Sequence, residues 1–372
     1  MHCSCKILKS FSICSLAICS FLLTSCRGDE VVYPTIGTQV TEEVRQGGLY
    51  VLCEGNMGTN KARLDYVNLE SGTYYSNWYG AQNPNQLKEL GDVGNDIQQY
   101  GGKLYAVINC SHKVEVMDLQ ARHIAQIDIP NCRYITFYGN KGYISAYVGS
   151  VADGDMLGSV FEIDTATMAI TREVKVGHQP DELCIMEDKL YVCNSGGYLP
   201  NRYDSTVSVI NLHSFNEIKQ IPVGLNPTRL RVDNQHKLWV CCQGNYYSVK
   251  PSVAVVKNGE VIRRIETPCA NIAIYGTTAY VLDAENKKLC LYSTDNFSEQ
   301  ESPFDLSKYE HPYGLLPTED GLFLTDAKNY VSSGVLHCLG YDGKERWQAK
   351  TGDIPGHLCL INRAYELYET KK

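Results

Sequence analysis

The feature that most constrains the fold is a short β-rich motif that recurs along the chain. Its seven copies are GLYVLC from Gly48, KLYAVI from Lys103, KGYISA from Lys141, KLYVCN from Lys189, KLWVCC from Lys237, TAYVLD from Thr278 and GLFLTD from Gly321. Short apolar runs bounded by Gly, Asn, Asp and Pro are typical of strands. The motif therefore predicts seven equivalent strands in a chain built by repetition.

Each copy of the motif belongs to a larger unit of four short strands. The clearest unit runs from Asp181 to Gly224, where strands are predicted over 182–186, 189–193, 206–212 and 217–223. A turn motif also precedes each first strand, and its seven copies begin at Gly94, Cys132, Pro180, Pro227, Cys269, Pro312 and Pro355. A β-helix would have much shorter repeats. Seven four-stranded units of roughly 40–50 residues predict an all-β, seven-bladed β-propeller with four antiparallel strands in each blade.

The register of the repeats predicts how the ring closes. The chain enters the repeat at a second strand, Gly48–Cys53, and the matching first strand appears only at Gly356–Ile361. We therefore expect the C-terminal strand to complete the first blade. Such closure removes the exposed sheet edges that an open array would leave.

The N-terminal segment has the character of an export signal. Lys6 and Lys9 precede an apolar stretch over 11–23, which is short for a membrane span and typical of a secretory signal. The following Leu23-Thr24-Ser25-Cys26 is similar to a bacterial lipobox, which implies cleavage before Cys26 and lipidation of that residue; a plain signal peptide is the alternative. The acidic residues after Cys26 are similar to the surface-export signal of Bacteroidetes lipoproteins. The predicted organisation is a signal peptide over 1–25, a lipidated Cys and tether over 26–46, part of which can pack on the propeller, and the propeller over 47–372.

Charge and cysteine usage narrow the class further. The net charge of −8 becomes −8 − 2 = −10 when Lys6 and Lys9 are removed, and no basic stripe indicates nucleic-acid binding. Eleven of the 16 cysteines follow Cys26, and none forms a C-x-x-C motif. Most lie within apolar strands, as Cys184 and Cys359 do, where Cys acts as a small core hydrophobe. We predict that most of these thiols are reduced. The sequence does not decide whether a few disulfides link neighbouring blades.

The predicted topology places long loops on one face of the ring. The connection from second to third strand lies at the same end of a blade as the connection to the next blade. In this chain these connections are long, at 54–63, 148–158, 195–205, 243–252 and 327–334. Binding residues concentrate on loops that a rigid scaffold holds together, so this face is the predicted functional face.

Candidate binding residues come from the channel mouth and from these loops. The mouth should present the residues that begin each first strand, among them Asp96, Arg133, Tyr134, Asp181, Glu182, Arg229, Asn271, Tyr313 and His357. The loops add Asn56, Tyr147, Tyr198, Tyr203, Tyr246, Tyr247 and Tyr330. A tyrosine offers a flat apolar ring and a polar tip, which suits an amphiphilic ligand. The alternative is a purely structural polar ring in a wet channel.

Catalytic signatures are missing from the sequence. It contains no G-x-S-x-G, H-E-x-x-H or P-loop. Asp153-Gly154-Asp155 could hold Ca²⁺ with loop carbonyls, but an exposed turn is the favoured interpretation. The sequence therefore predicts a binding protein, with no catalytic residue, cofactor or metal.

The chain resembles known propellers at two levels. Turns such as VGHQPDEL and VGLNPTRL resemble those of YncE-like and NHL-like propellers, a resemblance that covers nearly all of the predicted mature chain. Three stretches, over 49–72, 90–118 and 324–358, resemble the BtuG-type cobalamin-binding surface lipoproteins of Bacteroidetes. That resemblance implies capture of cobalamin or another corrinoid at the outer-membrane surface for a BtuB-like TonB-dependent transporter, with the membrane reached only through the lipid anchor.

Two other functions stay open. The propeller fold also hosts lyases and lactonases, which would require a histidine and a carboxylate together at the channel mouth, with His357 as the histidine. A surface binder of another ligand, such as a glycan, would present an aromatic platform on the loop face.

Overall fold

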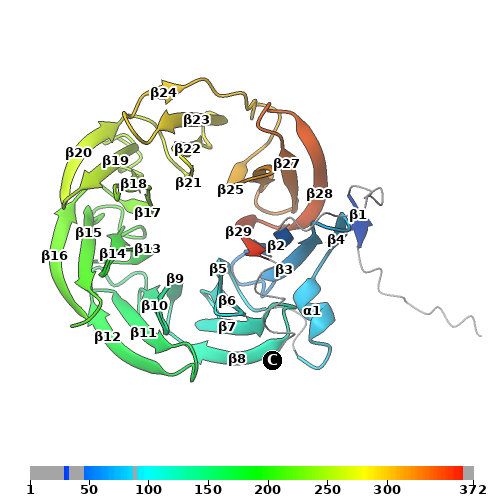
Figure 1. Ribbon diagram of the computed structural model, residues 1–372. Coiled ribbons are helices and arrows are strands. Elements are labelled where there is room, and N and C mark those ends of the chain that lie inside the picture. Colours follow the sequence, from blue (N-terminus) through cyan, green and yellow to red (C-terminus); the bar gives the residue numbers. More distant parts are fainter. Residues whose placement is uncertain (1–28, 33–45, 87–89, 363–372) are drawn as a thin grey trace, which may run out of the picture.

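The computed structural model describes residues 29–32, 46–86 and 90–362, which form a ring of seven antiparallel sheets around a central axis (Figure 1). Six sheets have four strands and one has five. This confirms the predicted all-β, seven-bladed propeller. The described residues also form one short helix, α1 (Trp78–Gln82), beside the first blade.

Blades 2 to 7 each consist of four strands that follow one another in the chain, with the innermost strand first. Blade 2 holds β5 (Gly94–Tyr100), β6 (Lys103–Ile108), β7 (Lys113–Asp118) and β8 (His123–Asp128), and blade 3 holds β9 (Cys132–Tyr138), β10 (Lys141–Ala146), β11 (Ser159–Asp164) and β12 (Ile170–Lys175). Blade 4 holds β13 (Pro180–Met186), β14 (Lys189–Asn194), β15 (Thr206–Asn211) and β16 (Asn216–Pro222), and blade 5 holds β17 (Pro227–Val232), β18 (Leu238–Cys242), β19 (Ser252–Lys257) and β20 (Glu260–Ile265). Blade 6 holds β21 (Asn271–Tyr275), β22 (Thr278–Asp283), β23 (Lys288–Ser293) and β24 (Glu299–Gln300), and blade 7 holds β25 (Pro312–Thr318), β26 (Gly321–Asp326), β27 (Ser333–Leu339) and β28 (Glu345–Asp353).

Blade 1 joins the two ends of the ring. From the rim to the axis its strands are β1 (Glu30–Val31), β4 (Thr73–Tyr75), β3 (Arg63–Asn68), β2 (Gln46–Cys53) and β29 (Pro355–Asn362). The antiparallel pairing of β29 with β2 confirms the predicted closure. The pairing of β1 with β4 shows that part of the predicted tether extends the first blade. The predicted signal peptide, Cys26, most of the tether and the last ten residues lie outside the described residues.

The core lies between the faces of neighbouring blades. The recurring motif supplies its centre, and in blade 2 the run from Leu104 to Ile108 is fully buried. The motif tyrosines Tyr50, Tyr105 and Tyr191 are buried as well. Because apolar side chains on both faces of a sheet need a neighbouring sheet to cover them, each blade depends on the two beside it.

The cysteines match the predicted chemistry, with one bridge that the sequence could not assign. Nine of the eleven cysteines after Cys26 are free, and six of these are buried. Cys241 on β18 and Cys269 before β21 form a disulfide, which joins blades 5 and 6. Within the described part of the chain, no helix is long and apolar enough to cross a membrane.

Candidate functional site

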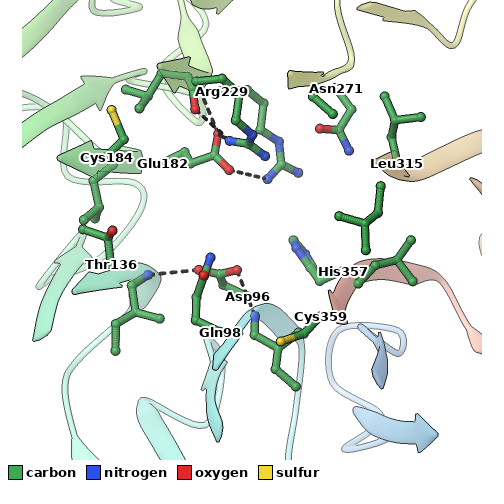
Figure 2. Close-up of a pocket in the computed structure, with 18 of the residues that line it drawn as sticks. Asp96, Gln98, Thr136, Glu182, Cys184, Arg229, Asn271, Leu315, His357 and Cys359 are labelled. Atoms are coloured by element: carbon green, nitrogen blue, oxygen red, sulfur yellow. Dashed lines mark hydrogen bonds and ion pairs between the residues drawn. The ribbon is translucent and has the colours of Figure 1, made fainter. Parts of the chain in front are cut away.

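The innermost strands β5, β9, β13, β17, β21, β25 and β29 surround a central channel with a volume of about 770 Å³ (Figure 2). These strands all begin at the end of the ring where the long loops lie. We call this end the mouth. Side chains at the start of each inner strand therefore meet around the mouth, as the sequence predicted.

A repeated backbone feature shapes the mouth. In six of the seven blades the pairing of the first two strands shifts register near the start of the inner strand, as it does between Pro227 and Arg229. Such bulges redirect side chains. In five blades a non-glycine residue with positive φ lies directly before the inner strand; these residues are Val93, Asn131, Gln179, Asn226 and Ile354. Positive φ is rare for β-branched residues and costs energy, so the surrounding fold must hold this geometry in place.

Glu182 anchors one cluster of charges in the channel wall. Its Oε2 accepts hydrogen bonds from Arg231 Nη1 at 2.5 Å and from the backbone N–H of Leu230 at 2.8 Å (Figure 2). Its Oε1 lies 3.7 Å from Arg229 Nη1. Burial opposes ionisation of Glu182, but the two arginines and the hydrogen bonds outweigh it and lower the pKa of this carboxyl. Glu182 is therefore a charged group that also ties blade 4 to blade 5.

Asp181 anchors a second cluster between blades 3 and 4. Its Oδ1 accepts from Arg133 Nε and from the Tyr147 hydroxyl, both at 3.0 Å. The Arg133 guanidinium also lies 4.9 Å from the ring centroid of Tyr147 and 5.8 Å from that of Tyr134. A buried cation between aromatic faces gains cation–π stabilisation in addition to its ion pair.

Asp96 and His357 lie across the opening from Glu182 and Arg229 (Figure 2). Asp96 accepts hydrogen bonds from the backbone N–H groups of Ile97 and Ile135, at 2.8 and 3.0 Å. Burial raises the pKa of Asp96 above its usual value, although His357 partly offsets the effect. Asp96 thus joins blade 2 to blade 3 as Glu182 joins blade 4 to blade 5.

His357 connects the channel to the first loop of the chain. Its Nε2 lies 3.4 Å from Glu54 Oε1, and its ring meets that of Tyr134 edge-on at 6.2 Å. Glu54 also lies beside Tyr313, and burial followed by the charge of Glu54 raises the pKa of that phenol. Tyr313 in turn contacts Tyr330 edge-on at 5.8 Å. A histidine and a carboxylate therefore do come together at the mouth.

Four of the predicted tyrosines contact one another in pairs. Tyr198 contacts Tyr147 edge-on, and Tyr203 contacts Tyr246 edge-on, both at 6.2 Å between ring centroids. Tyr198, Tyr246 and Tyr247 are 51%, 67% and 83% exposed, so their rings are available to a ligand. A groove of about 510 Å³ is lined by Tyr246 and Tyr247 together with Glu266 and Glu285.

The structure brings most of the predicted site residues together. Contacts join Arg133, Tyr134, Tyr147, Asp181, Tyr198, Arg229 and His357 into one network at the mouth, and the pairs Tyr313–Tyr330 and Tyr203–Tyr246 lie at the same end of the ring. Within the described residues, no hydrogen bond between side chains, ion pair or ring contact joins Asn56 or Tyr247 to this network.

One interpretation of the sequence requires correction, and two residues at the mouth, Glu54 and Arg231, were not predicted. Tyr147 was predicted to be a ligand-binding side chain of a loop, but it is buried and its hydroxyl donates to Asp181. Glu54 was not a predicted site residue. Its signal was its position directly after β2, at the first residue of a long loop, but its partner His357 lies at the other end of the chain.

The described residues give little support for a metal site or for a nucleophilic cysteine. Asp155 is ion-paired with Arg202 at 2.8 Å, as befits an exposed turn. No group of three or more potential metal ligands occurs within the described ranges. Burial raises the pKa of Cys184 in the channel wall well above its usual value, so its thiol is a poor nucleophile.

The chain is similar in sequence to part of a curated protein. No family model matches the chain. A curated relative, antigen Lp49 of Leptospira interrogans, is 27% identical over 145 residues, which are 35% of this chain; the match spans about a third of that protein, 32%.

Three solved structures illustrate the fold. A quinonprotein alcohol dehydrogenase-like protein of Bacteroides thetaiotaomicron has a TM-score of 0.65 at 12% identity, covering 85% of this chain and 78% of that one. A candidate 6-phosphogluconolactonase of Bacteroides uniformis has a TM-score of 0.62 at 12% identity, covering 85% and 100%. A streptogramin B lyase has a TM-score of 0.54 at 10% identity, covering 72% and 86%. At these low identities the similarities support the fold alone, so the function has to be inferred from the site.

Proposed function

We propose that this protein is a surface-anchored propeller that captures cobalamin or a related corrinoid at the mouth and passes it to a TonB-dependent outer-membrane transporter. One observation carries the proposal: the mouth joins a charged hydrogen-bonding ring to exposed tyrosine rings on the same face. A corrinoid is a large flat ring system with peripheral amides, so it needs both kinds of contact.

The sequence resemblance and the geometry support the same site. The three stretches that resemble BtuG-type proteins contribute Glu54, Asp96, Tyr330 and His357. All four lie at the mouth, although the stretches are far apart in the chain. In this proposal the ligand lies across the opening and contacts the loops.

Binding rather than turnover is the favoured activity. The charged side chains at the mouth are largely engaged with one another or with backbone groups, which gives a rigid, pre-organised surface. The proposed anchor is the lipid on Cys26, and metabolic labelling with palmitate tests it: label should enter the native protein and be lost in Cys26→Ser. Label in both proteins, or in neither, would overturn the anchor.

A second candidate function has one specific observation behind it. Glu54 and His357 form the histidine–carboxylate pair that a propeller lyase or lactonase would need, with Tyr313 beside them. An assay of the purified protein on a streptogramin B or a lactone tests this function. Turnover that His357→Ala abolishes without loss of folding would favour it over binding.

Isothermal titration of the soluble protein from Arg27 onward with cyanocobalamin tests the main proposal. We expect one-to-one binding that weakens in Tyr246→Ala. Tyr275→Ala is the matched control, because Tyr275 is an exposed tyrosine at the opposite end of the ring, stacked on Tyr341. No heat and no thermal stabilisation at saturating ligand would rule the proposal out.

A further inference from the structure

Arg229 is a cation at the mouth whose guanidinium forms no side-chain hydrogen bond within the described part of the chain. Its side chain is only 14% exposed, and its contact with Glu182, at 3.7 Å, is longer than a hydrogen bond. A guanidinium carries five N–H donors. Burying such a charge without acceptors is costly, so this position is suited to an acceptor that arrives with a ligand.

Glu182 does not supply the missing hydrogen bond, because its Oε1 lies 3.7 Å from Arg229 Nη1 and its Oε2 has other partners. Arg231 and the Leu230 backbone N–H both donate to its Oε2. Arg231 also donates to the Leu230 carbonyl at 2.7 Å, which fixes it in place. The two arginines of β17 therefore differ: Arg231 is paired within the protein, whereas Arg229 is held beside the pair with its donors available.

Tyr134 determines the direction in which Arg229 can bind. Its ring centroid lies 5.1 Å from the Arg229 guanidinium carbon. An aromatic ring over a guanidinium covers a face of the plane and leaves the N–H groups at its edges. Figure 2 shows Arg229 facing Asp96 and His357 across the opening, so a ligand group at the mouth can reach these edges.

The charge balance of the mouth limits the ligand group. Arginines and carboxylates lie close together there, and the titratable groups of these clusters are Arg133, Arg229, Arg231, His357, Glu54, Asp96, Asp181 and Glu182. Because the acids are as numerous as the bases, the mouth has no excess of positive charge. A group with one negative charge and two oxygens matches Arg229, whereas a dianion would be repelled by the surrounding carboxylates.

We infer that Arg229 binds a singly charged oxyanion of the captured ligand, a phosphodiester or a carboxylate. The inference rests on the proposed function, in which this group is the phosphodiester of the nucleotide arm of cobalamin. The arm would then reach into the mouth while the corrin ring lies on the loop tyrosines.

Titrations with two corrinoids test the inference. Cyanocobalamin carries the nucleotide arm and its phosphodiester, whereas dicyanocobinamide lacks both. Arg229→Gln should weaken cyanocobalamin about 10- to 100-fold, as expected for a hydrogen bond to a charged group, and should leave dicyanocobinamide nearly unchanged. Arg263→Gln is the matched control, since it removes the same charge from the exposed outer strand of the same blade.

The outcomes separate the inference from the proposed function. Equal weakening of both corrinoids by Arg229→Gln would overturn the inference and leave the function standing. Failure of the native protein to bind either corrinoid would overturn the function and the inference with it. Thermal unfolding should confirm that Arg229→Gln is folded, because Glu182 keeps Arg231 and Leu230 as partners. Arg229→Lys, which keeps the charge and loses the planar fork, should fall between the two proteins in its preference for cyanocobalamin.

Discussion

Two arcs of the channel wall share one strand geometry and differ in chemistry. The charged arc, formed by β5, β9, β13 and β17, presents Asp96, Glu182 and two arginines of β17, and the same strands carry the Arg133–Asp181 ion pair. The neutral arc, formed by β21 and β25, presents Asn271, Ala273 and a run from Leu315 to Pro317. The repeat therefore fixes where a side chain lies, and the individual residue at that place decides what it can bind.

The arcs also differ in how they hold neighbouring blades together. In the charged arc, carboxylates of one inner strand accept backbone N–H groups of the next, as Asp96 does from Ile135 and Glu182 from Leu230. In the neutral arc, the Asn271 amide donates to the Tyr313 carbonyl at 3.1 Å. In the charged arc, the side chains that join blades are therefore also the ones that could contact a ligand. Variants of this arc must be tested both for folding stability and for ligand binding.

The largest expected effect is the loss of Asp181. Asp181→Ala leaves the Arg133 guanidinium buried without its ion pair and removes the acceptor of Tyr147, so we expect about 3–5 kcal/mol less stability in urea unfolding. Asn271→Ala in the neutral arc is the comparison, with an expected loss of about 0.5–1.5 kcal/mol for neutral hydrogen bonds. Equal losses at both positions would contradict the distinction between the arcs.

The disulfide joins the arcs and should have the next largest effect. Cys241 and Cys269 link blades 5 and 6 across a sequence separation of 28 residues. Their replacement by alanine should cost about 2–4 kcal/mol, as for other bridges that close loops of this length. A reducing agent should lower the Tm of the native protein toward that of the double variant and leave the variant unchanged. A native Tm that does not respond to reduction would count against the bridge.

Binding should depend on loops above both arcs. Tyr246 belongs to a loop above the charged arc, and Tyr330 belongs to a loop above the neutral arc. We expect Tyr246→Ala and Tyr330→Ala each to weaken the affinity for cyanocobalamin about tenfold, as the loss of a central aromatic contact does. Titration of both variants measures this. An effect at Tyr246 alone would confine the ligand to the charged arc and refute a site that spans the opening.

Acid should destabilise the charged arc through Glu182. Its pKa is below the ordinary value of 4.5 in the folded protein, so its contribution to stability is fully present above that pH and is lost as the pH falls through the folded pKa. Glu182→Gln should therefore lose less stability than the native protein between pH 7 and pH 3, as followed by thermal unfolding.

In the same arc, the pKa shift of Asp96 has the opposite direction to that of Glu182, so acid should affect stability in the opposite way. Its folded pKa is above the ordinary 3.8, so its contribution is fully present below that pH and is lost as the pH rises through the folded pKa. Asp96→Asn should accordingly lose more stability than the native protein on acidification. Parallel acid profiles for the two variants would show that the environments of these carboxyls are not as different as described.

The smallest effect is expected at the Asp153–Asp155 turn. Asp155 and Arg202 are exposed, and ion pairs of this kind contribute little. Asp155→Ala should leave the Tm unchanged, and Ca²⁺ or a chelator should not alter the Tm of the native protein. A rise in Tm with Ca²⁺ that Asp155→Ala removes would identify a calcium site.

The repeat allowed the fold to be predicted from the sequence, whereas the site could be predicted only in part. Period-2 patterning and the motif at Lys189 or Gly321 define strands locally, so blade number and closure follow directly. The mouth depends on features with no local signal. Gln179, Asn226 and Ile354 precede prolines, which favours extended backbone, yet they adopt positive φ. The pairing of Glu54 with His357 and of Cys241 with Cys269 depends on which strands the ring brings together.

A crystal structure of the soluble protein with cyanocobalamin would show whether the mouth binds a corrinoid. We expect the corrin ring to lie across the mouth, in contact with Tyr246 on one side and Tyr330 on the other, with the nucleotide phosphate at Arg229. Cyanocobalamin at the opposite end of the ring, or an empty mouth in crystals grown with saturating ligand, would contradict this expectation.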